Sequence, residues 1–350
     1  MLSHSLDWLK QPVQPLNTQA KEAAIARQNI LTKPRGSLGL LEEVATQFAA
    51  WQGQECPQLD RIIVRVFAGD HGVCQQGVSA FPQIVTVQMI ENFVQGGAAI
   101  SVLSRDAKAD FAVVNMGVAN PLLNDAGVIN TPVGDGTHDF SEQPAMSQEQ
   151  CAQAINLGRE SLGSLEGITL YVAGEMGIGN TTSASAIYAA LLGLSAEEVS
   201  GPGTGVDLQG IQRKIKAIKT ALDLHREQLT EPLDILRCVG GFEIAAMVGS
   251  YIACAQQGVP SVVDGFISTA AALLAVKINP GVSDWLLFSH QSAEPAHVKA
   301  LEYMQAKALL NLGMRLGEGS GAATAIPLLR TALLLHNQMA TFDQAGVNSP

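Results

Sequence analysis

The 350-residue sequence has few cysteines, and no two of them stand at the C-x-x-C spacing of zinc and redox sites. The cysteines are odd in number and lie far apart in the chain: Cys56, Cys74, Cys151, Cys238 and Cys254. We therefore expect reduced and mostly buried thiols.

The sequence also lacks a run of basic residues and a long apolar run. It has 21 Lys and Arg against 32 Asp and Glu, a formal net charge of -11. This charge disfavours nonspecific binding to nucleic acid or to an acidic membrane, so a phosphate-bearing ligand must be held by local groups. The first 17 residues show no basic segment followed by an apolar stretch, and apolar segments elsewhere are broken before membrane-spanning length. We expect a cytoplasmic protein with no nucleic-acid and no membrane partner.

Short apolar runs of strand length recur along the chain, and each stops at Gly, Asp or Asn. They occupy residues 61–73, 111–118, 168–180 and 260–268. Alanine-rich helical stretches lie among them, at 181–193, 214–225 and 243–257, and two further helices are predicted at 18–31 and from 37 to 51. This alternation predicts a parallel sheet with helices on both faces, whose ligands bind outside the carboxyl ends of the strands. Residues 119–147, rich in Gly, Pro, Asn and Asp, are predicted to be a surface connection.

The segment YVAGEMGIGNTT is the strongest local signal. Gly174, Gly177 and Gly179 follow a strand, and Asn180 opens a helix. Backbone N–H groups at such a turn can approach an anion, and the helix N-terminus adds partial positive charge. The segment matches neither G-x-x-x-x-G-K nor G-x-G-x-x-G. A tight turn with an ordinary threonine cap explains the pattern equally well.

Six other polar residues could each have a functional or a structural role. Lys214, after the glycines of GPGTG, could reach a phosphate or could be a solvated surface lysine. Asp70 and His71 end one strand and Asp264 ends another, but no third ligand stands at metal-binding spacing. Bonding to loop amides is therefore favoured. His290 and His297 are interpreted as structural histidines.

Glu318 stands between two glycines in MRLGEGSGAATAIP. A carboxylate there could simply complement the positive end of the following helix. That explanation leaves the flanking glycines unexplained, whereas a general base facing a flat ring would benefit from the missing bulk. The glycines favour the base.

Seven segments in their order resemble one family. FAGDHGV, GEMGIGNTT, VGGFEIAAMVG, VVDGFIS and MRLGEGSGAA, together with TKPRGSLG and SHQSAE, are similar to the nicotinate-nucleotide:dimethylbenzimidazole phosphoribosyltransferases of cobalamin lower-ligand synthesis. The resemblance runs from about residue 15 to about residue 338. No single segment would be specific, but the ordered set is.

The resemblance implies a pentosyltransferase without a metal or an organic cofactor. It would transfer the phosphoribosyl group of nicotinate mononucleotide to 5,6-dimethylbenzimidazole, with inversion at C1', and release nicotinate and α-ribazole 5'-phosphate. The implied fold is a Rossmann-like α/β domain, here 28–305, and a small helical domain made from both chain ends, here 1–27 with 306–350. The implied assembly is a homodimer.

The resemblance also implies roles for particular residues. Glu318 would be the catalytic base, and no residue would bind a metal. Arg315 and Leu316 would border the benzimidazole beside it, and Phe81 and Met89 would make its pocket apolar, which leaves the choice of azole open. The remaining substrate-binding positions would be Glu175, Gly177, Asn180, Thr181, Gly203, Lys214, Asp264 and Ser292.

Two other function classes remain to be weighed. A nucleotide-sensing module would keep the phosphate loops without turnover, and the retained Glu318 in its glycine frame argues against it. A nicotinamide-dependent dehydrogenase would need G-x-G-x-x-G and an acidic residue about 20 positions later, which are missing.

Overall fold

A single parallel sheet organises the molecule. The computed structural model describes residues 5–122, 124–201, 203 and 205–348. Seven strands pair in the order β3-β2-β1-β4-β5-β6-β7, every pair parallel. Their bounds are Ile62–Gly69 (β1), Asp110–Gly117 (β2), Val128–Asn130 (β3), Leu170–Met176 (β4), Ser261–Val263 (β5), Leu286–His290 (β6) and Ala308–Leu310 (β7). The strand order reverses between β1 and β4, and a parallel sheet has its ligand crevice at such a switch point.

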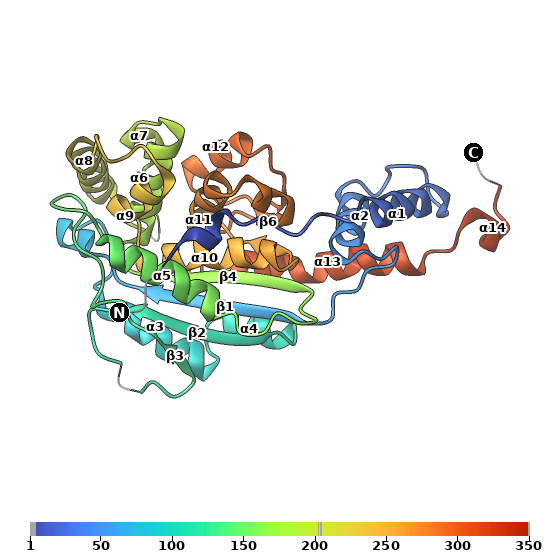
Figure 1. Ribbon diagram of the computed structural model, residues 1–350, viewed down its shortest axis with the longest axis horizontal. Coiled ribbons are helices and arrows are strands. Elements are labelled where there is room, and N and C mark those ends of the chain that lie inside the picture. Colours follow the sequence, from blue (N-terminus) through green and yellow to red (C-terminus); the bar gives the residue numbers. More distant parts are fainter. Residues whose placement is uncertain (1–4, 123, 202, 204, 349–350) are drawn as a thin grey trace.

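Helices cover both faces of this sheet, which confirms the predicted fold class. In Figure 1, α5 and α10 lie on one side of the strands, and α3 and α4 lie on the other. The helices are α1 (Thr18–Ile30), α2 (Leu40–Gln52), α3 (Ile84–Gln95), α4 (Ala99–Asp106), α5 (Gln148–Glu160), α6 (Asn180–Leu192), α7 (Ala196–Val199), α8 (Leu208–Leu224), α9 (Pro232–Val239), α10 (Phe242–Gln256), α11 (Phe266–Ile278), α12 (Pro295–Tyr303), α13 (Ser320–Gln338) and α14 (Phe342–Ala345). Short 3-10 helices lie at Asp7–Lys10 (η1), Gly72–Gln76 (η2) and Pro280–Trp285 (η3).

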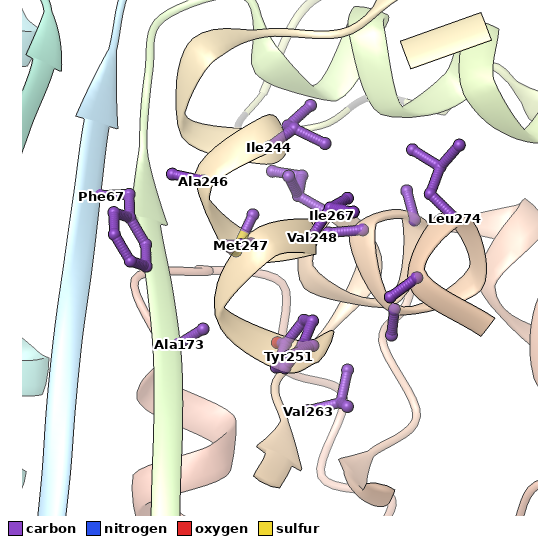
Figure 2. Close-up of a cluster of buried hydrophobic side chains, with 14 of the residues drawn as sticks. Phe67, Ala173, Ile244, Ala246, Met247, Val248, Tyr251, Val263, Ile267 and Leu274 are labelled. Atoms are coloured by element: carbon purple, nitrogen blue, oxygen red, sulfur yellow. The ribbon is translucent and has the colours of Figure 1, made fainter. Parts of the chain in front are cut away.

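The core is centred on α10, which is buried on every side. Every residue from Phe242 to Ala255 is buried, as expected for a helix that is apolar all round. Figure 2 shows Met247 and Tyr251 of α10 between Phe67 of the sheet and Leu274 of α11. All eight residues of β1 are buried as well, which explains its unbroken apolar sequence.

One predicted segment differs from expectation. Residues 119–147 were expected to form a surface connection; residue 123 lies outside the described residues, and for the others the prediction was wrong at two places. Val128–Asn130 forms β3 and pairs with β2, and Phe140, Ala145 and Met146 are buried in the core. The Gly and Pro content masked these short apolar pieces, because each is too short to show periodicity.

The helices α1, α2 and α13 pack on one another beside the sheet (Figure 1). This grouping supports a small helical unit made from both chain ends, although its predicted boundaries remain a prediction. Two elements pack with the other group than their predicted range suggests. The helix α2, within 28–305, packs in the helical group, and the strand β7, within 306–350, pairs with β6 in the sheet. Within the described part of the chain, no helix is both long and apolar enough to cross a membrane.

The contact between α5 and α10 depends on a glycine from each helix. A Cβ added to Gly249 would lie 2.0 Å from the carbonyl oxygen of Ile155, and one added to Gly158 would lie 2.0 Å from that of Ala246. In an isolated helix, Gly→Ala would stabilise by about 1 kcal/mol. Here an added methyl group would force the two helices apart, so the cost of overpacking exceeds this gain and the substitution destabilises the protein.

We predict that Gly249→Ala lowers the free energy of unfolding by about 1–3 kcal/mol. Urea denaturation measures the change, and Glu160→Ala, at an exposed end of α5, should remain within about 0.5 kcal/mol of the wild type. A stabilised Gly249→Ala protein would contradict the close crossing.

Candidate active site

A cavity of about 440 Å³ opens at the carboxyl ends of β4, β5 and β6. It brings together every site residue predicted from the sequence, although these residues lie far apart along the chain, from Phe81 to Glu318. They are Phe81, Met89, Glu175, Gly177, Asn180, Thr181, Gly203, Lys214, Asp264, Ser292, Arg315, Leu316 and Glu318. The cavity thus lies at the sheet edge where the sequence predicts the site, and the role of each residue stays a prediction.

Glu318 lies in a turn of three consecutive residues with positive φ. The angles are 87° at Gly317, 66° at Glu318 and 86° at Gly319. A residue other than glycine adopts this left-handed region at a cost of about 1–2 kcal/mol, and such strain gathers at functional sites. Asp264 helps to hold the turn, because its carboxylate accepts the Gly319 N–H at 3.2 Å.

The glycines around Glu318 are needed by the backbone. A Cβ on Gly317 would lie 2.3 Å from Glu175 Oε1, and one on Gly174 would lie 2.1 Å from the carbonyl oxygen of Glu318. From the sequence, the flanking glycines were expected to make room for a flat ligand. The structure corrects that reason: the turn has to adopt left-handed backbone and to lie directly against β4.

Three carboxyl groups lie close together around this turn. Glu175 Oε1 accepts the Glu318 N–H at 3.3 Å, and Glu175 Oε2 accepts a hydrogen bond from the Asn180 amide. Asp264 Oδ1 accepts the Ala322 N–H at 2.8 Å, which places its charge at the N-terminus of α13. Glu175, Asp264 and Glu318 are all buried.

Burial and mutual repulsion disfavour the ionised forms of these acids. Burial, and then the negative charge of Asp264, raise the pKa of Glu318 to about 7. Burial, Asp264 and Glu243 raise the pKa of Glu175 well above its usual value. Among the described residues, no group forms a hydrogen bond with Glu318 Oε2. Glu318 is thus a carboxyl with free bonding capacity and enhanced basicity.

A cationic group lines another part of the cavity. Lys214 is 2% exposed, and its Nζ donates to Thr181 Oγ1 at 2.8 Å and to the Gly201 carbonyl at 3.4 Å. Arg315 Nη1 donates to the Gly203 carbonyl at 3.0 Å. Burial lowers the pKa of Lys214 to about 8, and the nearby Glu294 opposes this shift. The solvated-lysine interpretation is therefore wrong, because α8 turns Lys214 into the cavity.

The glycine-rich loop after β4 leads directly into α6. Gly179, with a φ of 101°, is the N-cap, and no described side chain caps this end of the helix. The Asn180 side chain reaches Glu175 instead. An ordinary threonine cap does not therefore explain the loop, and the N-terminus of α6 lies beside the cavity, where its partial positive charge favours an anion.

One segment contributes several apolar side chains to the lining. Phe81 precedes α3, and Val85 and Met89 lie on it. Phe81 and Leu316 are about half exposed, at 48% and 51%, which is unusual for large apolar side chains beside charged groups. Such a wall is suited to the face of an aromatic ring.

Sequence reasoning missed some of the lining residues. His290, interpreted as structural, lines the cavity with Nε2 3.8 Å from Asp264 Oδ1. Glu294 is a buried carboxyl beside Lys214 and Arg315. Its position in SHQSAE, just after a strand, could have indicated from the sequence that it lies at the site. His297 is not among the lining residues; it accepts the N–H of Ser292, which is one of them, and its other ring nitrogen bonds Thr269, as a structural histidine does.

Asp70 and His71 are buried, are not among the lining residues and contact other protein groups. Asp70 accepts hydrogen bonds from Thr86 and Ala119, and His71 Nε2 lies 2.7 Å from Glu243 Oε1. In the part of the chain that the structure describes, no group of three or more His, Cys, Asp and Glu could hold a metal ion.

Comparison with known proteins gives consistent matches over nearly the whole chain. A family model described as "Phosphoribosyltransferase" matches residues 13–347. The nicotinate-nucleotide–dimethylbenzimidazole phosphoribosyltransferase of Pseudomonas putida (strain W619) is 53% identical over 97% of each chain. That of Ectopseudomonas mendocina is 53% identical over 98% of each chain. A crystal structure of such an enzyme from Thermus thermophilus superposes with a TM-score of 0.89 at 44% identity, covering 95% of this chain and 100% of that chain.

Glu318 should make stability depend on pH. Its folded pKa of about 7 exceeds the usual 4.5, so stability falls as pH rises between these values and stays reduced above 7. We predict that the free energy of unfolding of Glu318→Gln, measured relative to the wild type, is higher at pH 8 than at pH 5. The difference should be at most about 3 kcal/mol, and smaller to the extent that solvent screens the charge. Chemical denaturation at both pH values measures this difference.

Glu166→Gln provides a matched control for the substitution itself, because Glu166 is exposed and is not among the lining residues. An effect of Glu318→Gln that is equal at pH 5 and pH 8 would contradict the raised pKa.

Proposed function

The chain belongs to the nicotinate-nucleotide–dimethylbenzimidazole phosphoribosyltransferase family of cobalamin synthesis, and we propose that Glu318 is the general base of its reaction. The observation that carries the proposal is the buried Glu318 carboxyl, with an unpartnered oxygen and a pKa raised to about 7. A carboxylate is most useful as a base when its pKa lies near the working pH.

The proposed reaction exchanges one ring nitrogen for another at C1' of the ribose. The C1'–N bond of nicotinate mononucleotide breaks, and its electron pair remains on the ring nitrogen, so nicotinate leaves with a neutral pyridine ring. A nitrogen of 5,6-dimethylbenzimidazole forms the new bond from the opposite face of the sugar, which converts the β linkage into an α linkage. The N–H proton of the azole passes to Glu318.

The cationic group supports the placement of the nucleotide phosphate. Lys214 donates to Thr181 and to the Gly201 carbonyl, and Arg315 donates to the Gly203 carbonyl. The N-terminus of α6, which begins at Asn180 beside the cavity, adds partial positive charge. In a chain with a net charge of -11, this local arrangement supplies the attraction that the overall field does not.

The apolar wall supports the placement of the azole. Phe81, Val85, Met89 and Leu316 present hydrocarbon surface, and Glu318 follows Leu316 by two residues. A benzimidazole lying against this wall would bring its N–H within reach of the carboxylate. Holding two rings on opposite sides of one sugar contributes to catalysis by positioning alone.

Further expectations rest on the family resemblance. We propose that the enzyme is a homodimer, that it works in the cytoplasm without a nucleic-acid partner, and that its small helical domain carries Glu318. We also propose that Gly177, Asn180, Gly203, Asp264 and Ser292 contact substrate or shape its site, since all of them line the cavity. Light scattering measures the oligomeric state.

The reaction can be tested directly with purified protein. Nicotinate mononucleotide and dimethylbenzimidazole, without added metal, should yield nicotinate and α-ribazole 5'-phosphate in equal amounts. We predict that Glu318→Gln loses about 10²- to 10⁴-fold in kcat and still binds the nucleotide, whereas Glu166→Gln behaves as the wild type. Absence of product at high enzyme concentration would refute the activity, and a fully active Glu318→Gln variant would refute the base.

The pH dependence of turnover is a separate prediction. Glu318 accepts a proton only when it is ionised, so kcat at saturating nicotinate mononucleotide should rise with pH and level off above about 7. The residual activity of Glu318→Gln should lack this rise. If both proteins show the same profile, another group controls it.

A further inference from the structure

The FAGDHGV motif connects to the cavity through a residue that no motif contains. Thr86 is fully buried on α3 and is not among the residues that line the cavity. Its hydroxyl donates to Asp70 Oδ1 at 2.6 Å and accepts the Ile178 N–H at 3.2 Å. The Thr86 hydroxyl thus both donates and accepts, and it links the loop at Ile178 to the Asp70 carboxylate through a chain of hydrogen bonds.

The two ends of this chain belong to different parts of the site. Ile178 lies between Gly177 and Gly179 in the loop proposed to bind the nucleotide. Thr86 lies beside Val85 and one turn before Met89, both in the apolar wall proposed for the azole. One hydroxyl therefore joins the two walls of the cavity.

The anchor of the chain is fixed by the sheet. Asp70 follows β1 directly, and its Oδ2 accepts the Ala119 N–H at 2.9 Å just beyond β2. Ile178 itself follows β4. These hydrogen bonds therefore connect the carboxyl ends of three adjacent strands at the point where the strand order reverses.

A second bond restricts the same loop residue. Cys74 Sγ donates to the Ile178 carbonyl at 2.9 Å, so the amide and the carbonyl of Ile178 are both held. Gln83 Nε2 donates to the His71 carbonyl at 3.1 Å and ties the start of α3 to the same motif. The loop and the helix are thus positioned against one common support.

We propose that Thr86 is a positioning residue that sets the spacing between the nucleotide loop and the azole wall. The proposal rests on the proposed function, because it assumes that the two walls hold the two substrates. Bond formation needs the azole nitrogen and C1' about 3–3.5 Å apart, and a displacement of about 1 Å can cost about 10²-fold in rate. A hydroxyl that touches neither substrate can therefore control turnover through geometry alone.

Three variants test this assignment. Thr86→Val keeps the shape and removes the hydroxyl, and we expect kcat to fall about 10- to 100-fold while each substrate alone binds with its wild-type Kd. Thr86→Ser restores the hydroxyl and should restore kcat. Thr46→Val removes a buried threonine hydroxyl whose two hydrogen bonds among the described residues lie within α2, so it should lower Tm and leave kcat unchanged.

A merely structural role predicts a different pattern. Thr86→Val would then lower Tm with unchanged kcat per folded molecule, and that result would overturn the proposal, as would a Thr86→Ser variant as slow as Thr86→Val. If Thr86→Val does not fold, Asp70→Asn weakens the same chain at its anchor with little change of shape, and a normal kcat there overturns the proposal equally. A wild-type protein without turnover would instead refute the proposed function.

Discussion

The site depends on the contact of the Gly317–Gly319 turn with strand β4. The Glu318 carbonyl lies so close to Gly174 that no Cβ fits between them, and the Glu318 N–H donates to Glu175. Asp264 then receives the Gly319 N–H and fixes the start of α13. A helix from the C-terminal end of the chain thereby delivers its carboxylate to the carboxyl edge of the sheet, beside the loop that follows β4.

This contact concentrates unfavourable electrostatics in a small volume. Glu175, Asp264 and Glu318 are buried within one cluster, and Glu243 adds its charge nearby. Burying carboxylates together costs stability, because each opposes ionisation of the next. The same repulsion makes Glu318 a stronger base than an exposed glutamate. Loss of stability and gain of basicity are therefore two consequences of one arrangement, as is common at functional sites.

The sequence was sufficient to predict where the site lies. Each apolar strand ends in polar residues, and parallel strands bring these ends to one edge, which is why Glu175 and Asp264 could be placed together. Contacts between distant residues could not be predicted from single motifs. The hydrogen bond from Ile178 to Thr86, the approach of Glu318 to Gly174 and the inward direction of Lys214 all depend on how α3, α13 and α8 pack. Short buried pieces such as Phe140 were missed because local composition resembles that of a loop.

The central claim is that burial and the charge of Asp264 hold the Glu318 carboxyl at an unusually high pKa. Carbon-13 NMR of labelled glutamate side chains, assigned by comparison with Glu318→Gln, measures this titration directly. We expect a midpoint of about 7 in the wild type and a lower midpoint in Asp264→Asn, which removes the repelling charge. A Glu318 titration near its usual 4.5 in the folded wild-type protein would contradict the claim.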